Sequence, residues 1–135
     1  MRLWNPFKKK SSEVKEIPVR DPDEIKDPSD HNSFIQRGWA YHARGEQEKA
    51  ESDFRRAISF SPESVDAKYG MGLVMKSQGK TQEAIEYFEK TMDLILQGKL
   101  EHHSQSEMMR RLTLAHINEL TTGDWNLEDQ IWSQS

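Results

Sequence analysis

The chain has 135 residues, enough for one domain with a tail and too few for a second full catalytic domain. Apolar residues make up 34%, less than compact domains usually contain, so part of the chain is not expected to pack. Nineteen basic and 23 acidic residues give a net charge of -4, which disfavours a nucleic-acid partner, and the absence of cysteine excludes disulfides and thiolate metal sites.

The first ten residues combine aromatic and cationic side chains and contain no acid. This mixture is typical of a segment that makes weak contact with an anionic membrane surface. The alternatives are a disordered start and docking of this aromatic tail into a groove of its own or a neighbouring chain. The residues expected to make the membrane contact are Arg2, Leu3, Trp4, Phe7, Lys8, Lys9 and Lys10.

Residues 11–30 are acidic, with seven acids against three basic residues. Pro18, Pro22 and Pro28 each remove an amide donor and keep the preceding residue away from helical geometry. The sequence therefore predicts an extended linker here, and residues 1–30 together are expected to form a disordered tail and linker. No apolar core of a secretory signal precedes the lysines, so we expect a cytoplasmic setting, or a peripheral one at the membrane.

From His31 onward, apolar residues recur at helical spacing. Phe34, Gly38 and Tyr41 share one helical face, and Gly45 interrupts the helix. A second apolar face follows and ends before a proline; it consists of Ala50, Phe54, Ala57 and Ile58. This pattern predicts a helical hairpin over residues 31–64.

The same pattern returns after 34 residues. Shifting the sequence by this length superimposes Gly38 on Gly72, Gly45 on Gly79, Ala50 on Ala84 and Phe54 on Phe88. Small residues at matched positions indicate that close helix crossings and turns recur. A second hairpin is therefore predicted over residues 65–98.

Residues 99–135 are predicted to form a capping helix and a partial third repeat. Met108, Leu112 and Ala115 form a helical apolar stripe, and a turn is expected at Gly123. A short closing helix would use Leu127, Ile131 and Trp132. The predicted fold is all-α, a short solenoid of two antiparallel helical hairpins completed by this partial unit.

The first hairpin resembles a tetratricopeptide repeat. The residues that carry this resemblance are Gly38, Tyr41, Gly45, Ala50, Phe54, Ala57 and Pro62. The second hairpin keeps Met71-Gly72, Gly79, Ala84 and Phe88 but has Lys68, Met75, Thr91 and Leu96 at other positions of the signature. The resemblance covers most of residues 31–98. It implies an adaptor that binds a peptide or helix of a partner in a concave groove lined by the first helix of each hairpin.

Two matched stripes are the predicted lining of that groove. Ile35, Trp39 and His42 follow an i, i+4, i+7 spacing, and the positions 34 residues later are Tyr69, Leu73 and Lys76. Trp39 and Tyr69 are the expected anchors, because aromatic residues dominate binding hot spots. The alternative is that the stripes pack against the tail, the third hairpin or a second copy.

Catalytic patterns are missing from the sequence. No His-Glu-x-x-His motif occurs, and the adjacent pair His102-His103 diverges by about 100° on a helix, which disfavours a shared metal. We therefore predict no enzyme activity, no metal and no cofactor. The predicted function is a protein-binding adaptor, and the rival is a membrane-surface assembly factor or a self-associating structural subunit. The partner is expected to be a protein or peptide, and the oligomeric state stays open.

Overall fold

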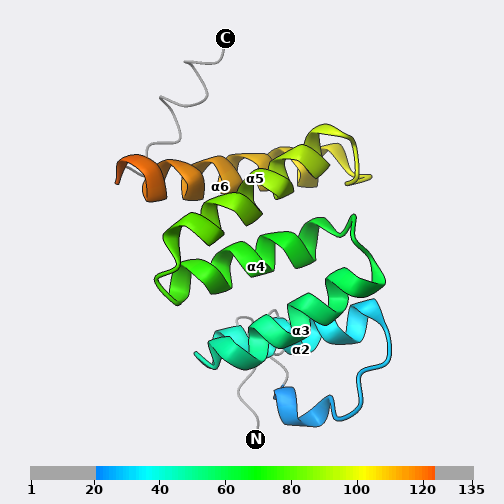
Figure 1. Cartoon of the computed structure of the whole chain (residues 1–135). Coiled ribbons are helices and arrows are strands. Elements are labelled where there is room, and N and C mark those ends of the chain that lie inside the picture. The colour runs from blue at the N-terminus through cyan, green and yellow to red at the C-terminus, as the bar shows by residue number, and fades with distance from the viewer. Residues whose placement is uncertain (1–20, 124–135) are drawn as a thin grey trace, which may run out of the picture.

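The computed structural model describes residues 21–123, and this part of the chain is all-α, as predicted (Figure 1). It contains one short 3-10 helix, five α-helices and, within those residues, no strand. In chain order the elements are η1 (Pro22–Glu24), α2 (His31–Ala43), α3 (Gln47–Phe60), α4 (Val65–Ser77), α5 (Thr81–Leu96) and α6 (His103–Thr122).

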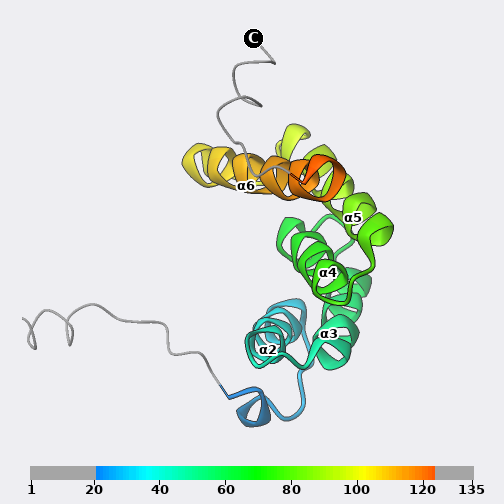
Figure 2. The ribbon, with the colours of Figure 1, turned by 90° about the vertical axis from the view of Figure 1, so that its left-hand side faces the viewer.

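The helices form two layers. Figure 2 shows α2, α4 and α6 in one layer, which we call the inner layer, and α3 and α5 in the other, the outer layer. Each outer helix packs most extensively on the inner helix that precedes it in the chain. The two predicted hairpins are therefore α2 with α3 and α4 with α5, and they stack as a solenoid.

Both hairpins turn through a glycine in the left-handed conformation. Gly45 has φ of +80° and Gly79 has φ of +76°, a region that residues with a Cβ atom rarely adopt. The same backbone bond follows each glycine: the amide of Glu46 donates to the carbonyl of Tyr41 at 2.9 Å, and that of Lys80 to the carbonyl of Met75 at 2.9 Å. The 34-residue spacing of the glycines thus reflects one turn built twice.

Two phenylalanines of the outer layer fill the core. Phe54 and Phe88 are fully buried, and inner helices cross them closely at glycines. A Cβ atom at Gly38 would lie 3.0 Å from the Phe54 ring, and one at Gly70 would lie 2.7 Å from it. Phe54 is therefore held between α2 and α4, which joins the first hairpin to the second.

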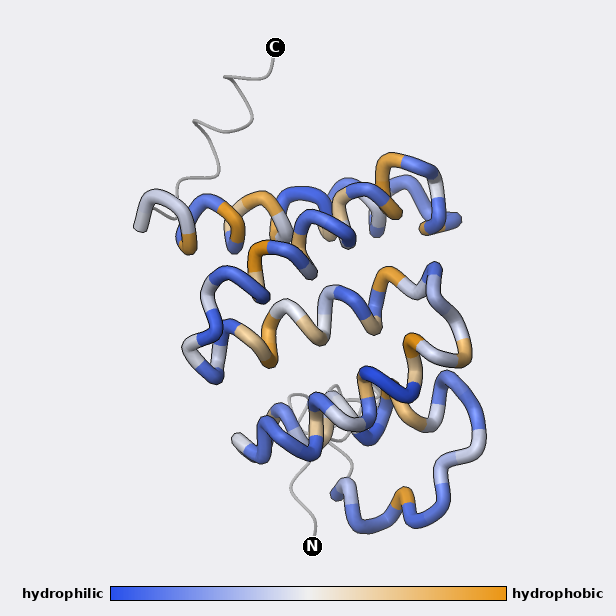
Figure 3. Tube along the Cα trace, viewed as in Figure 1, coloured by the Kyte–Doolittle hydropathy of each residue, from blue (hydrophilic) through white to orange (hydrophobic). Residues whose placement is uncertain are grey.

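The amino-terminal end of the solenoid is covered by residues 21–25, a stretch that is mainly hydrophilic (Figure 3). Pro22 is buried, and the Asp21 carboxylate caps η1 by accepting a bond from the Asp23 amide. Arg44 lies 3.1 Å from Asp21, and Arg37 donates to the carbonyl of Ile25 at 3.2 Å. The expected extended linker is therefore wrong for these residues, because an Asp cap followed by proline favours a helical turn and two arginines hold it against α2.

Helix α6 covers the other end of the solenoid. Met109 packs with Val65, Leu94 and Ile95, while Thr113 and His116 are also buried. Met108, the first residue of the predicted stripe, is 55% exposed. The packing face of α6 is therefore displaced from the stripe expected from the sequence, because Met109 reaches the gap between α4 and α5. The residues proposed for a closing helix, Leu127, Ile131 and Trp132, lie outside the described part of the chain.

Candidate functional site

All six residues of the predicted groove lie on the inner layer, on α2 and α4. We call this set the inner surface: Ile35, Trp39, His42, Tyr69, Leu73 and Lys76. Ile35 is buried, and the other five are half-buried. The inner surface is thus partly used by the fold, and its members do not form a uniformly exposed stripe.

Aromatic contacts connect the two helices at the inner surface. The Trp39 ring meets Phe54 edge to face at a centroid distance of 5.0 Å and lies 6.4 Å from the Tyr69 ring. His42 lies beside Trp39 at 6.0 Å, and its Nδ1 is 2.8 Å from the side-chain oxygen of Gln47. Such contacts orient large rings and limit their freedom. The two predicted anchors, Trp39 and Tyr69, are therefore neighbours across α2 and α4.

A polar cluster joins α4 to α6. Tyr69 Oη lies 3.1 Å from His116 Nε2, and Lys76 Nζ lies 3.2 Å from His116 Nδ1. Lys76 also donates to Glu119 Oε2 at 2.6 Å. Because the ammonium can only donate, Nδ1 of the neutral imidazole accepts and Nε2 carries the proton toward Tyr69. The polar groups of Tyr69 and Lys76 are therefore already engaged in contacts with α6.

Burial is the main cause of the unusual ionisation in this cluster. It lowers the pKa of His116 to about 4, and the nearby Lys76 charge contributes in the same direction. The imidazole stacks on Phe88 at a centroid distance of 4.9 Å with the ring planes 5° apart. Burial also raises the pKa of Tyr69. His116 is thus neutral at pH 7 and serves as an aromatic packing residue.

His116 and Glu119 are residues that the predicted groove does not include. Where α4 packs on the first hairpin, Gly70 lies against the Phe54 ring. Where α6 packs on the second hairpin, His116 stacks on Phe88, the equivalent of Phe54. If the turn glycines Gly79 and Gly123 are aligned, which is a shift of 44 residues, His116 instead corresponds to Gly72. The register of α6 therefore differs by two residues from the one that the turn glycines indicate, and the sequence contains no signal for this shift.

The accessible remainder of the inner surface centres on Trp39 and Leu73. Both are half-buried apolar side chains packed against the main core. Asp66 and Ser77 are exposed, and they lie seven residues before and four residues after Leu73, on the same side of α4. The arrangement offers apolar contact area bordered by polar groups, and it contains no nucleophile paired with a base.

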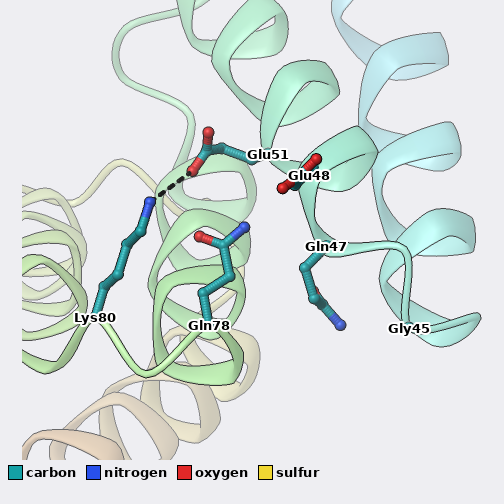
Figure 4. Close-up of a pocket in the computed structure, with 6 residues that line it drawn as sticks. All are labelled: Gly45, Gln47, Glu48, Glu51, Gln78 and Lys80. Carbon is teal, nitrogen blue, oxygen red and sulfur yellow. Dashed lines mark ion pairs between the residues drawn. The ribbon is translucent and has the colours of Figure 1, made fainter.

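A separate pocket lies between the two hairpin turns (Figure 4). Its lining is polar and comes from Gly45, Gln47, Glu48, Glu51, Gln78 and Lys80. Lys80 Nζ is 3.9 Å from Glu51 Oε1, a weak ion pair. Among residues 21–123 no three His, Asp or Glu side chains are placed to hold a metal ion together. The pocket therefore shows no metal-site geometry.

The residues predicted to contact a membrane, Arg2 to Lys10, lie outside the described part of the chain. Within residues 21–123, no helix combines the length and apolarity that crossing a membrane requires.

Comparison with known proteins agrees with the fold. Models of the tetratricopeptide repeat match residues 31–64 and residues 66–94, which are the two hairpins described above. No curated protein matches the chain. Through these two hairpins the chain belongs to the tetratricopeptide-repeat family.

Proposed function

We propose that the chain is an adaptor that binds an apolar segment of a partner protein on the inner surface, at Trp39 and Leu73. Tetratricopeptide repeats are generally protein-interaction modules, and the first hairpin and its neighbour match that family. The observation that carries the proposal is that Trp39 on α2 and Leu73 on α4, two half-buried apolar side chains, occupy equivalent positions of the two repeats on the inner layer. Partly exposed apolar surface of this kind marks interaction sites.

The side chains of the inner surface favour a partner segment that binds through apolar side chains over one that binds through a carboxylate. Some tetratricopeptide-repeat proteins bind a terminal carboxylate through asparagines in the groove, and this chain has Trp39 and Leu73 at the corresponding positions. The Lys76 ammonium is already bound to Glu119. A partner segment is therefore expected to bind through aromatic or aliphatic residues. No role in catalysis is proposed, since the adaptor function requires none.

The experiment is a selection of displayed random peptides on the full chain, followed by affinity measurement on variants. Leu73→Gln keeps a good helix former and removes apolar contact, so peptides that use this surface should bind about 10-fold or more weakly. Ser52→Gln, at an exposed position two residues from Phe54 on α3, is the matched control and should bind normally. Thermal melts of both variants test folding. Selected peptides that bind Leu73→Gln as tightly as the unchanged chain would place the binding site elsewhere.

A further inference from the structure

We propose that the amino-terminal segment, residues 1–10, docks on the inner surface of its own chain and covers Trp39 and Leu73 until a partner displaces it. This inference rests on the proposed function, because it assigns a regulator to the same surface. The docking residues are Leu3, Trp4 and Phe7, three large apolar side chains within five positions. Pro6 excludes a regular helix, so the segment would bind as an extended peptide.

The point where the chain enters the described structure favours docking within one molecule. Asp21 is fixed beside Arg44, the residue that follows α2, at 3.1 Å. The anchor thus lies at the end of α2 that carries His42. Fourteen residue steps separate Phe7 from Asp21 and span up to about 46 Å when extended, whereas the 13 residues of α2 span about 20 Å. The segment can therefore reach every part of the inner surface.

Such a short tether makes docking favourable even when the contact is weak. Short flexible linkers give effective concentrations in the millimolar range, so a contact with a dissociation constant of about 0.1 mM would be occupied in about nine chains of ten. A partner that binds more tightly would still displace the segment. Reversible covering therefore needs only a few apolar contacts.

Charge is complementary between the segment and the rest of the chain. Residues 1–20 carry six basic and two acidic side chains, a net charge of +4, whereas residues 21–123 carry 13 basic and 18 acidic ones, a net charge of -5. Asp66 is exposed on the side of α4 that carries Leu73. Lys8 to Lys10 follow the apolar residues and supply half of the basic side chains of residues 1–20. Because exposed charges are screened over about 8 Å at physiological salt, docking should weaken as salt increases.

Disulfide trapping in the full chain tests the proposal directly, because the chain contains no cysteine of its own. Asn5→Cys is combined with Ser77→Cys, an exposed position one helical turn beyond Leu73. The control combines Asn5→Cys with Ser52→Cys, which is exposed on α3 on the side away from Phe54. In a glutathione buffer, the first pair should form an intrachain disulfide at least 10-fold faster than the control. Adding Trp4→Ser and Phe7→Ser should abolish this difference.

Several outcomes would overturn the proposal. Equal trapping rates for the two cysteine pairs would show no preference for the inner surface. Disulfides formed mainly between chains, which size-exclusion chromatography resolves, would make the occupant the segment of a second copy. Failure of the first cysteine pair to trap faster than the control even without vesicles, together with co-flotation of the chain with phosphatidylserine vesicles, would assign the segment to membranes.

Peptide binding separates this proposal from the proposed function. If the segment covers the inner surface, selected peptides should bind the Trp4→Ser, Phe7→Ser variant about 10-fold more tightly than the unchanged chain. Equal binding to both would retain the adaptor function and overturn self-docking. Trapping of the first cysteine pair without any selected peptide that depends on Leu73 would retain self-docking and contradict the adaptor function.

Discussion

Arg37 and Asp53 form a two-point ion pair between the helices of the first hairpin. Arg37 Nη2 lies 2.7 Å from Asp53 Oδ1, and Nε lies 2.8 Å from Oδ2. The Asp53 side chain is only 3% exposed, and its hydrogen bond to Arg37 raises the pKa of the guanidinium. At the position of Arg37 a tetratricopeptide repeat usually has leucine. An arginine is accommodated here because Asp53 on α3 pairs with it.

Removing one partner of this pair should be costly. Arg37→Leu leaves a buried carboxylate without its cation and should lower the free energy of unfolding by about 3 kcal/mol. The double variant Arg37→Leu, Asp53→Leu removes both charges and should lose much less, because no unpaired charge remains. Urea unfolding of the two single variants and the double variant measures the coupling. A double variant as unstable as the sum of the singles would contradict a direct interaction.

Gly70 should tolerate no side chain. Because a Cβ atom there would lie 2.7 Å from the Phe54 ring, Gly70→Ala should lower the free energy of unfolding by about 1 to 3 kcal/mol despite the better helix propensity of alanine. Ser77→Ala, at an exposed position of the same helix, is the control and should have little effect. The measurement is a denaturant melt. A more stable Gly70→Ala variant would mean that α4 can move away from Phe54 without loss.

His116 should make the protein less stable in mild acid. Its pKa is about 4 when folded and near 6.5 when unfolded, so below pH 6.5 the unfolded chain binds a proton that the folded chain does not. Its contribution is complete above pH 6.5 and is lost as the pH falls toward 4. From pH 7.5 to pH 5 the free energy of unfolding should decrease by about 2 kcal/mol. Urea unfolding at the two pH values checks this, and His116→Gln should remove most of the decrease.

The sequence predicted the two hairpins because their signals are steric and local. Gly45 and Gly79 are needed for left-handed turns, and Phe54 and Phe88 fill equivalent core positions. Each pair is therefore identical in residue type and separated by the same 34 residues. Gly70 has no such counterpart, since the residue 34 positions earlier is Gln36 at the exposed start of the solenoid. Repeat matching therefore reveals contacts within a hairpin better than contacts between hairpins.

The partners of the inner surface were not predictable for a related reason. Tyr69 and Lys76 contact His116 and Glu119, which lie 40 or more residues away on a helix outside the two matched repeats. The rotation of α6 depends on how Met109 fits between α4 and α5, and no periodicity in the sequence encodes that fit. The sequence thus identified which helices form the inner surface, but not which of its residues α6 covers.

The ion pair between Lys76 and Glu119 provides a final prediction, about the cause of the low pKa of His116. Burial contributes most and the Lys76 charge contributes second, while Glu119 acts in the opposite direction. Lys76→Met should therefore raise the pKa of His116 while leaving it below 6.5, because the ring stays buried against Phe88. Glu119→Gln should lower that pKa further, since it removes the carboxylate that acts against burial and the Lys76 charge. Titration of the His116 ring proton by NMR measures both shifts. Equal values in the unchanged chain and both variants would show that neither charge reaches the imidazole and that burial acts alone.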